Sequence, residues 1–316
     1  SEAYPDFGTF YRELTRLHSA GRYREAMERA AAAQPHYPDD EAILLHFRAS
    51  MAARLHNTAL ALHLLREALD AGYWYAPVFW ESPELAALRG LDEFKALRVD
   101  SDRRHASALA AARPELFVHL PEQAREPLPV LLALHGNLHD GQRELAHWLG
   151  LLRQGWLVAS AQSSQVAGPN RYIWDDRRQA ERELQAHYNA LRDEYPLEAG
   201  HFVVGGFSMG AETAIALALR GVLPADGFIA VAPSGPLIRE LDEHGELLAA
   251  PPPDGLRGAI VIGSHDPMVG NVTGLADRLE AAGVPLRLLI YDGLGHDYPP
   301  GFAQRLPELI EFVVSG

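Results

Sequence analysis

The chain has 316 residues, of which 47% are hydrophobic and 22% charged, as in a globular protein long enough for more than one domain. Its 28 basic and 42 acidic residues give a net charge of −14, which argues against nucleic acid and anionic membrane surfaces as partners. Because the sequence contains no cysteine, disulfide bonds, zinc–thiolate sites and thiol redox chemistry are excluded.

Neither end of the chain nor its interior shows a membrane signal. No run of about 18 apolar residues is present, so no membrane span and no membrane partner are expected. The segment Ser1–Asp6 lacks the basic and apolar regions of a signal peptide. The chain does not begin with Met, so removal of an earlier leader stays open. We expect a cytoplasmic protein.

The first hundred residues have a helical pattern. Four helices are expected, at Phe7–Leu17, Tyr23–Ala33, Asp40–Arg54 and Thr58–Ala71. Tyr23 and Ala26 recur as Thr58 and Ala61, an offset of about 35 that is close to the tetratricopeptide period. Two repeats are fewer than a free-standing solenoid needs, so we expect this layer to pack on a second domain. It could bind a peptide, or it could stabilise the second domain or make the protein a homodimer; the degenerate repeat favours the structural role.

The end of this helical region is rich in aromatic residues. The cluster Tyr73–Trp80 is expected to form an interface core, or alternatively to cover a pocket. A terminal helical unit is expected over 82–97, and the polar, Ala/Arg-rich segment Asp100–Ala112 is interpreted as a domain junction. The prediction is a tetratricopeptide-like domain over residues 1–100 and a second domain over 113–316.

From residue 113 onward, short apolar runs alternate with helical patterns. Seven strands are expected, at Glu115–Leu120, Val130–Leu134, Leu157–Ala161, Phe202–Gly206, Phe228–Ala232, Ala259–Gly263 and Leu286–Tyr291. Helices are expected between them, at Gln142–Arg153, Asp176–Tyr195, Ala211–Arg220, Thr273–Ala282 and Ala303–Val313. Such alternation predicts an α/β fold with a mostly parallel sheet flanked by helices.

The segment 203–211, Val-Val-Gly-Gly-Phe-Ser-Met-Gly-Ala, places a serine between two glycines where a strand meets a helix. This is the G-x-S-x-G nucleophile elbow in the strand–turn–helix setting that the motif requires. The turn raises the Ser208 hydroxyl above the sheet. The amide of Met209 and the positive end of the following helix then face a developing oxyanion.

A serine hydroxyl needs a base, and in this arrangement an acid and then a histidine should follow the serine along the chain. Asp266 follows the expected strand 259–263, and His296 follows the expected strand 286–291. We assign His296 as the general base and Asp266 as the residue that orients it. Taken singly, Asp266 could be a helix N-cap and His296 an exposed loop residue. Asp292 and Asp297 are rival carboxylates that lie too near His296 in sequence.

The loop His135–Gly141 follows the expected strand 130–134. An H-G-x loop at this position supplies the second oxyanion amide, which we assign to Asn137, paired with Met209. His135 is expected to hold the loop in place. His135, His139 and Asp140 have ligand-like side chains, but histidines four residues apart share a face only on a helix, so no metal site is expected.

These motifs together, L-H-G-x, G-G-F-S-M-G, G-x-x-D-P and G-x-G-H, resemble the phospholipase/carboxylesterase and dienelactone-hydrolase-like branch of the α/β-hydrolases. The resemblance covers about residues 115–316. Dienelactone hydrolases proper use a cysteine nucleophile, which this chain lacks, so the resemblance implies a serine carboxylesterase. It implies hydrolysis of small carboxylic esters through an acyl-enzyme, without a cofactor, and does not name the substrate.

Two loops at the carboxyl edge of the sheet are expected to shape the substrate pocket. In the loop Gln162–Trp174, Tyr172 and Trp174 could contact the substrate or could equally anchor the loop to the core. The loop Gly235–Pro253 is too short for a large lipase cap.

Ester hydrolysis is the function that these observations favour. A serine peptidase of the same fold is the first alternative. A helical-repeat adaptor with an inactive hydrolase domain is the second, and the presence of all three triad residues argues against it.

Overall fold

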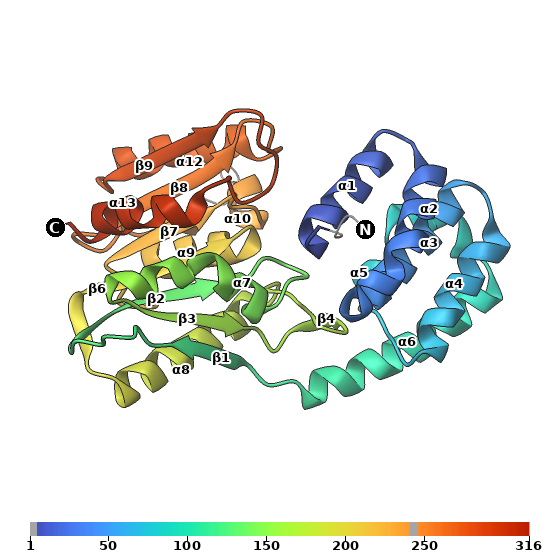
Figure 1. The fold of residues 1–316 in the computed structure, drawn as a ribbon, viewed down its shortest axis with the longest axis horizontal. Helices are drawn as coiled ribbons and strands as arrows, with labels where there is room; N and C mark the ends of the chain where they lie inside the picture. Colours follow the sequence, from blue (N-terminus) through green and yellow to red (C-terminus); the bar gives the residue numbers. More distant parts are fainter. Residues whose placement is uncertain (1–4, 241–245, 316) are drawn as a thin grey trace. The chain divides into compact units, whose positions relative to one another are not determined.

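The computed structural model describes residues 5–240 and 246–315. It divides into two compact units: a helical unit, Ser1–Ala112 with Val166–Arg171, and a sheet unit, Arg113–Gln165 with Tyr172–Gly316 (Figure 1). The first four residues, part of the segment without a signal-peptide pattern, lie outside the described residues, as do five residues of the expected loop 235–253. No helix of the described ranges is long and apolar enough to span a membrane.

The helical unit begins with four helices whose bounds agree closely with the predicted ones. In the first two of them buried apolar side chains recur every three or four residues, whereas the third buries nearly all of its residues from Ala42 to Ala53. Phe10 and Leu14 meet Ala26 and Ala30 in one cluster, where the small alanines let the helices approach closely. The helices of this unit are α1 (Phe7–Ser19), α2 (Tyr23–Ala33), α3 (Glu41–Arg54), α4 (Thr58–Asp70), α5 (Pro77–Trp80) and α6 (Asp92–Ala111), with 3₁₀ turns at Gln34–His36, Pro38–Asp40 and Pro83–Leu88.

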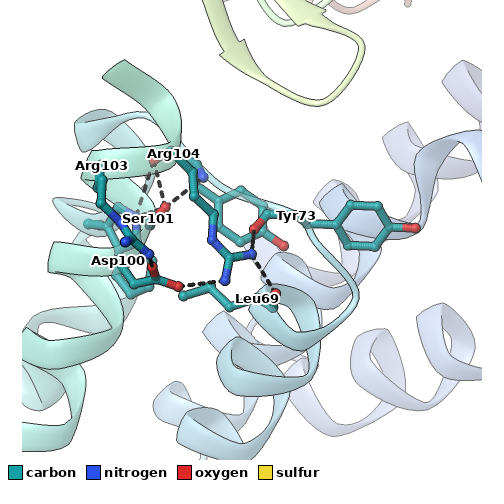
Figure 2. Close-up of polar contacts among 8 residues, drawn as sticks. Leu69, Tyr73, Asp100, Ser101, Arg103 and Arg104 are labelled. Carbon is teal, nitrogen blue, oxygen red and sulfur yellow. Dashed lines mark hydrogen bonds and ion pairs between the residues drawn. The ribbon is translucent and has the colours of Figure 1, made fainter. Parts of the chain in front are cut away.

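Helix α6 runs through the segment that the sequence analysis interpreted as a junction. Although this helix is polar, it is fixed by specific bonds to the segment before α5 (Figure 2). The buried Ser101 hydroxyl accepts hydrogen bonds from the Tyr75 amide at 2.8 Å and from Trp80 Nε1 at 3.1 Å. Arg104 donates to the Leu69 carbonyl at 2.6 Å. The polar composition of this segment did not indicate a helix, because side-chain hydrogen bonds hold α6 in place.

Aromatic side chains form a second core in the helical unit. Tyr75 and Trp80 are each 1% exposed, and their rings lie 6.3 Å apart at 66°. The buried imidazole of His46 contacts Tyr75 and bonds through Nε2 to the Phe79 carbonyl at 3.1 Å. The cluster predicted at 73–80 is therefore a core of this unit.

The segment Val166–Arg171 belongs to the helical unit although it lies between two segments of the sheet unit. The Ala167 carbonyl accepts a hydrogen bond from the Ala76 amide at 2.8 Å. The guanidinium of Arg171 forms an ion pair with Asp40, and both side chains are almost fully buried. The segment carries strand β4 (Val166–Gly168) and the first residue of β5 (Arg171–Tyr172), a two-stranded ribbon that the sequence analysis did not predict.

The sheet unit contains one seven-stranded sheet of order β1-β3-β2-β6-β7-β8-β9 (Figure 1). Strand β1 is antiparallel to β3, and the remaining neighbours are parallel. All seven predicted strands are present. They are β1 (Glu115–His119), β2 (Leu128–Leu134), β3 (Leu157–Gln162), β6 (Leu197–Phe207), β7 (Gly227–Val231), β8 (Arg257–Gly263) and β9 (Leu286–Tyr291).

Helices cover both faces of this sheet. Because side chains alternate along a strand, β2 sends Leu132 into one apolar layer and Leu131 into the other. The first layer holds α8 (Arg177–Glu194), α9 (Met209–Leu219) and α12 (Val269–Ala281). The second holds α7 (Gly141–Trp148) and α13 (Phe302–Val314). This three-layer arrangement confirms the predicted fold class and brings the carboxyl ends of β2, β6, β8 and β9 to one edge.

Candidate active site

Ser208 lies between strand β6 and helix α9, at a sharp turn. Its backbone has φ 55° and ψ −118°, a conformation that a residue with a side chain adopts only at a cost. The turn is held from both sides: the Ser208 amide donates to the Val231 carbonyl at 3.0 Å, and the Ser208 carbonyl accepts from the Ser234 amide at 3.1 Å. These bonds fix the hydroxyl at the first turn of α9.

The two glycines of the motif are required by close backbone contacts. A Cβ at Gly206 would lie 2.6 Å from the Leu134 carbonyl oxygen. A Cβ at Gly210 would lie 2.2 Å from that same oxygen and 2.4 Å from the His135 carbonyl oxygen. Strand β2 and the start of its loop therefore pass so near α9 that only glycine fits at either position.

His296 connects Ser208 with Asp266. Its Nε2 lies 2.9 Å from Ser208 Oγ, and its Nδ1 lies 2.7 Å from Asp266 Oδ2. The Asp266 side chain is fully buried, whereas the His296 side chain is 35% exposed. Hydrogen bonds thus connect a buried carboxylate, a partly exposed histidine and a partly buried serine hydroxyl, which is the geometry of a nucleophile, a base and a residue that orients the base.

The sequence left open an N-cap role for Asp266 and two rival carboxylates, Asp292 and Asp297. Met268 is the N-cap residue of α12, and the second oxygen of Asp266 accepts from the Met268 amide at 2.8 Å. Asp292 accepts from the Ser264 hydroxyl at 3.2 Å, and Asp297 accepts from the Tyr298 amide at 2.8 Å. Of these three carboxylates, Asp266 is the one bonded to His296.

The loop after β2 lies against the elbow. A Cβ at Gly136 would lie 2.9 Å from the Phe207 ring and 3.3 Å from Ser208 Cβ, so glycine at this position lets the loop pass close to the elbow. The Asn137 side chain accepts from the Trp174 amide at 2.9 Å and donates to Asp175 at 2.8 Å. The loop that carries the Asn137 amide is therefore fixed by side-chain bonds.

His135 supports this loop from below. It is 0% exposed, and burial lowers its pKa to about 4, so the ring is neutral around pH 7. Its Nε2 accepts from the Ser163 amide at 3.2 Å, which leaves the proton on Nδ1 to bond the Gly136 carbonyl at 2.8 Å. Both ring nitrogens are thus engaged in holding backbone.

Tyr172 and Trp174 have different surroundings. Trp174 is 1% exposed, stacks on His135 at 4.7 Å and donates through Nε1 to the His135 carbonyl at 2.8 Å. The sequence left open whether Trp174 contacts the substrate or anchors the loop to the core, and these contacts are those of an anchor. Tyr172 is half-buried, and its carbonyl accepts from the Leu138 amide at 2.7 Å.

Two buried carboxyl groups of the sheet unit, Glu212 and Glu144, were not singled out from the sequence. Glu212, one turn after Ser208, accepts from the Ile238 amide at 2.9 Å and fixes the short helix α10 (Pro236–Arg239); burial raises its pKa. Glu144 on α7 accepts from Trp148 Nε1 at 2.8 Å and from the Tyr298 hydroxyl at 2.5 Å. Burial raises the pKa of Glu144 to about 7, against the lowering effect of these two bonds. The sequence feature that could have drawn attention to Glu144 is its partner Tyr298, which lies two residues after the candidate base His296.

Within the described ranges no group of three or more His, Cys, Asp or Glu residues could hold a metal ion. His139 lies in the loop after β2, where its ring stacks on Phe207 at 5.9 Å.

Comparison with known proteins finds one matching family model and several solved structures of similar fold. Residues 9–109 match the family model described as A/B hydrolase-like, N-terminal domain. No curated protein matches the chain. An uncharacterized protein from Bacillus cereus ATCC 10987 is similar over 97% of this chain and 98% of its own, with 24% identity and a TM-score of 0.54.

Two further solved structures are similar over about two thirds of this chain. Esterase PE8 has 20% identity and a TM-score of 0.51, over 63% of this chain and 99% of its own. The Bacillus cereus carboxylesterase has 17% identity and a TM-score of 0.51, over 66% of this chain and 99% of its own. At such identities the likeness establishes the fold. The chain has an α/β-hydrolase fold, preceded by a helical region like the N-terminal domain of A/B hydrolase-like proteins.

Proposed function

We propose that this protein is a serine hydrolase that cleaves carboxylic esters through an acyl-enzyme. The observation that carries the proposal is the bonding of His296 to Ser208 Oγ at 2.9 Å and to Asp266 at 2.7 Å. The strained backbone of Ser208, at φ 55°, adds to it, because such strain is concentrated at functional positions.

In the first half of the reaction, Ser208 Oγ attacks the ester carbonyl carbon while its proton moves to His296 Nε2. Asp266 accepts a hydrogen bond from the Nδ1–H of the resulting imidazolium and stabilises its charge. The tetrahedral intermediate then collapses: the bond to the alcohol oxygen breaks, and His296 returns the proton to that oxygen. The alcohol leaves, and the acyl group remains on Ser208.

The amides of Met209 and Asn137 are the proposed donors to the oxyanion. Met209 is the first residue of α9, so its amide lies at the positive end of the helix dipole. Asn137 follows Gly136, which lies against Ser208. One such donor is worth about 3 kcal/mol of transition-state stabilisation. Tyr172 is the proposed substrate contact of the loop 162–174.

In the second half, His296 Nε2 removes a proton from water, and the hydroxide attacks the acyl carbonyl carbon. The bond between that carbon and Ser208 Oγ breaks, Ser208 regains its proton from His296, and the carboxylic acid leaves. Each proton that moves passes through His296, so the chain's own residues suffice for these steps.

The test is hydrolysis of p-nitrophenyl esters, from acetate to long acyl chains, by the wild type and by Ser208→Ala. We expect turnover of short esters by the wild type and its loss in the variant. Folded wild type that turns over no ester would contradict the proposal. An amide substrate cleaved as fast as the matching ester would instead indicate a peptidase.

A further inference from the structure

The candidate base lies in a loop without regular structure, between β9 and α13. On the N-terminal side of His296, the Leu294 carbonyl accepts from the His265 amide at 2.8 Å, and a Cβ at Gly263 would lie 2.0 Å from that carbonyl oxygen. The loop is therefore fixed to strand β8 on one side of His296. A histidine that must reach both a serine and a carboxylate also needs an anchor on its other side.

Tyr298 is that anchor. Its ring is packed between aromatic rings of three other elements: it stacks on His147 of α7 at 3.8 Å and 8°, and on Phe207 of β6 at 5.1 Å and 21°. It also contacts Phe302 of α13 at 5.0 Å. The same Phe207 ring lies 5.1 Å from the ring of His296. A shift of Tyr298 would therefore reach His296 both through the chain and through Phe207.

Glu144 fixes the position of Tyr298 within this stack. Aromatic packing alone lets a ring slide in its plane, whereas the hydroxyl of Tyr298 is bonded to Glu144 Oε1 at 2.5 Å. Glu144 is 2% exposed, and its Oε1 also accepts from Trp148 Nε1 at 2.8 Å, one turn along the same helix. The carboxyl group thus holds the tyrosine to helix α7, 154 residues away in the sequence.

We infer that Glu144 and Tyr298 are positioning residues that hold His296 within hydrogen-bonding distance of Ser208. This inference rests on the proposed function, and it assigns neither residue a contact with the substrate. Tyr298 fixes the His296 loop from its C-terminal side, and Glu144 fixes Tyr298.

The primary test is Tyr298→Phe, which removes the hydroxyl and keeps the stacked ring. The matched control is Tyr195→Phe, which removes another tyrosine–glutamate hydrogen bond, at 2.9 Å to Glu194, on the surface at the end of α8. For p-nitrophenyl acetate we expect kcat of Tyr298→Phe to fall about tenfold or more, as for a small displacement of a catalytic group, with KM little changed. Tyr195→Phe should retain the wild-type kcat.

A second pair of variants separates positioning from packing. Glu144→Gln keeps a hydrogen-bond acceptor of the same size and should retain most of the activity, whereas Glu144→Leu should lose as much kcat as Tyr298→Phe. Should Glu144→Leu fail to fold, Tyr298→Phe and Glu144→Gln carry the test. Activities are compared for folded protein, with the folded fraction of each variant measured by circular dichroism.

The outcomes distinguish this inference from the proposed function. If the wild type hydrolyses the ester and folded Tyr298→Phe has the same kcat, the inference is overturned and the proposed function stands. A loss of rate that matches the loss of folded protein also overturns it, because the role is then structural. A wild type that turns over no ester contradicts the proposed function itself.

Discussion

The two units of this chain bury polar side chains in different arrangements. In the helical unit Asp40 is paired with Arg171, and both groups end in the core. In the sheet unit the buried Asp266 is bonded to His296, which is partly exposed and reaches Ser208. A charge pair with both groups buried stabilises one conformation, whereas a buried carboxylate bonded to a partly exposed histidine that reaches a serine hydroxyl can also support chemistry. The following variants test that difference.

Asp266→Asn should have the largest effect. An amide at this position keeps the shape of the side chain but no longer stabilises the imidazolium, so kcat should fall about 10⁴-fold while the protein stays folded. The measurement is kcat for p-nitrophenyl acetate. Asp292→Asn, a rival carboxylate in a neighbouring loop, is the control and should leave kcat unchanged. The reverse pattern would show that the acid was wrongly assigned.

Asp40→Ala should affect stability. It leaves the Arg171 charge buried without its carboxylate partner, which typically costs about 3–5 kcal/mol of unfolding free energy. Urea denaturation measures this loss. Asp92→Ala removes an exposed pair with Lys95 and should have a much smaller effect. Equal losses of unfolding free energy in the two variants would mean that burial does not determine how much the Asp40–Arg171 pair contributes to stability.

Each unit also buries a neutral histidine, so low pH should lower the stability of both units. Burial lowers the pKa of His46 and of His135 from 6.5 to about 4. Between these values the unfolded chain binds the proton and the folded one does not. The contribution of each neutral histidine to the unfolding free energy is therefore complete above pH 6.5 and is lost as the pH falls toward 4. At pH 5 the loss is about 2 kcal/mol per histidine.

This acid effect is measured by urea denaturation of the wild type and of His46→Gln at about pH 7.5 and about pH 5. The variant should lose less stability on acidification than the wild type. His63→Gln, at an exposed position of α4, should behave like the wild type. An identical pH dependence of the wild type and His46→Gln would contradict the prediction.

The smallest effect is expected at Gly274, within helix α12. A Cβ there meets no atom within 4 Å, so Gly274→Ala should raise the unfolding free energy by about 0.5–1 kcal/mol. Gly210→Ala is the contrasting change, because its Cβ would lie 2.2 Å from the Leu134 carbonyl oxygen. Thermal denaturation compares the two. A gain in stability at Gly210 would contradict the close packing of the elbow.

Local patterns in the sequence predicted most of the elements and the three residues of the candidate site that hydrogen bonds bring together. The seven strands follow from short apolar runs, and helix α2 has the predicted bounds Tyr23–Ala33. Ser208, Asp266 and His296 were predicted together because each lies at or shortly after the carboxyl end of a strand, in the order that the motif requires. The part of α6 from residue 100 onward was interpreted as a junction because it is polar and rich in Ala and Arg. In the structure, the buried Ser101 bonds elements that the sequence does not place together.

Contacts between distant residues could not be predicted. Glu144 and Tyr298 are 154 positions apart, and Asp40 and Arg171 are 131 apart. Hydrophobic periodicity carries no information about which buried polar groups meet, since that depends on how the elements pack. The anchoring position of Trp174 could not be predicted for the same reason. An aromatic residue in a loop has no local feature that separates a core contact from a substrate contact.

The central claim is that Ser208 carries the acyl group. The most direct measurement is mass spectrometry of the wild type and of Ser208→Ala, quenched with acid during turnover of p-nitrophenyl acetate, followed by peptide mapping. We predict one acetyl group on the wild type, located on Ser208, and none on the variant. Turnover of the ester with the acetyl group on another residue, or undiminished turnover by Ser208→Ala, would contradict it.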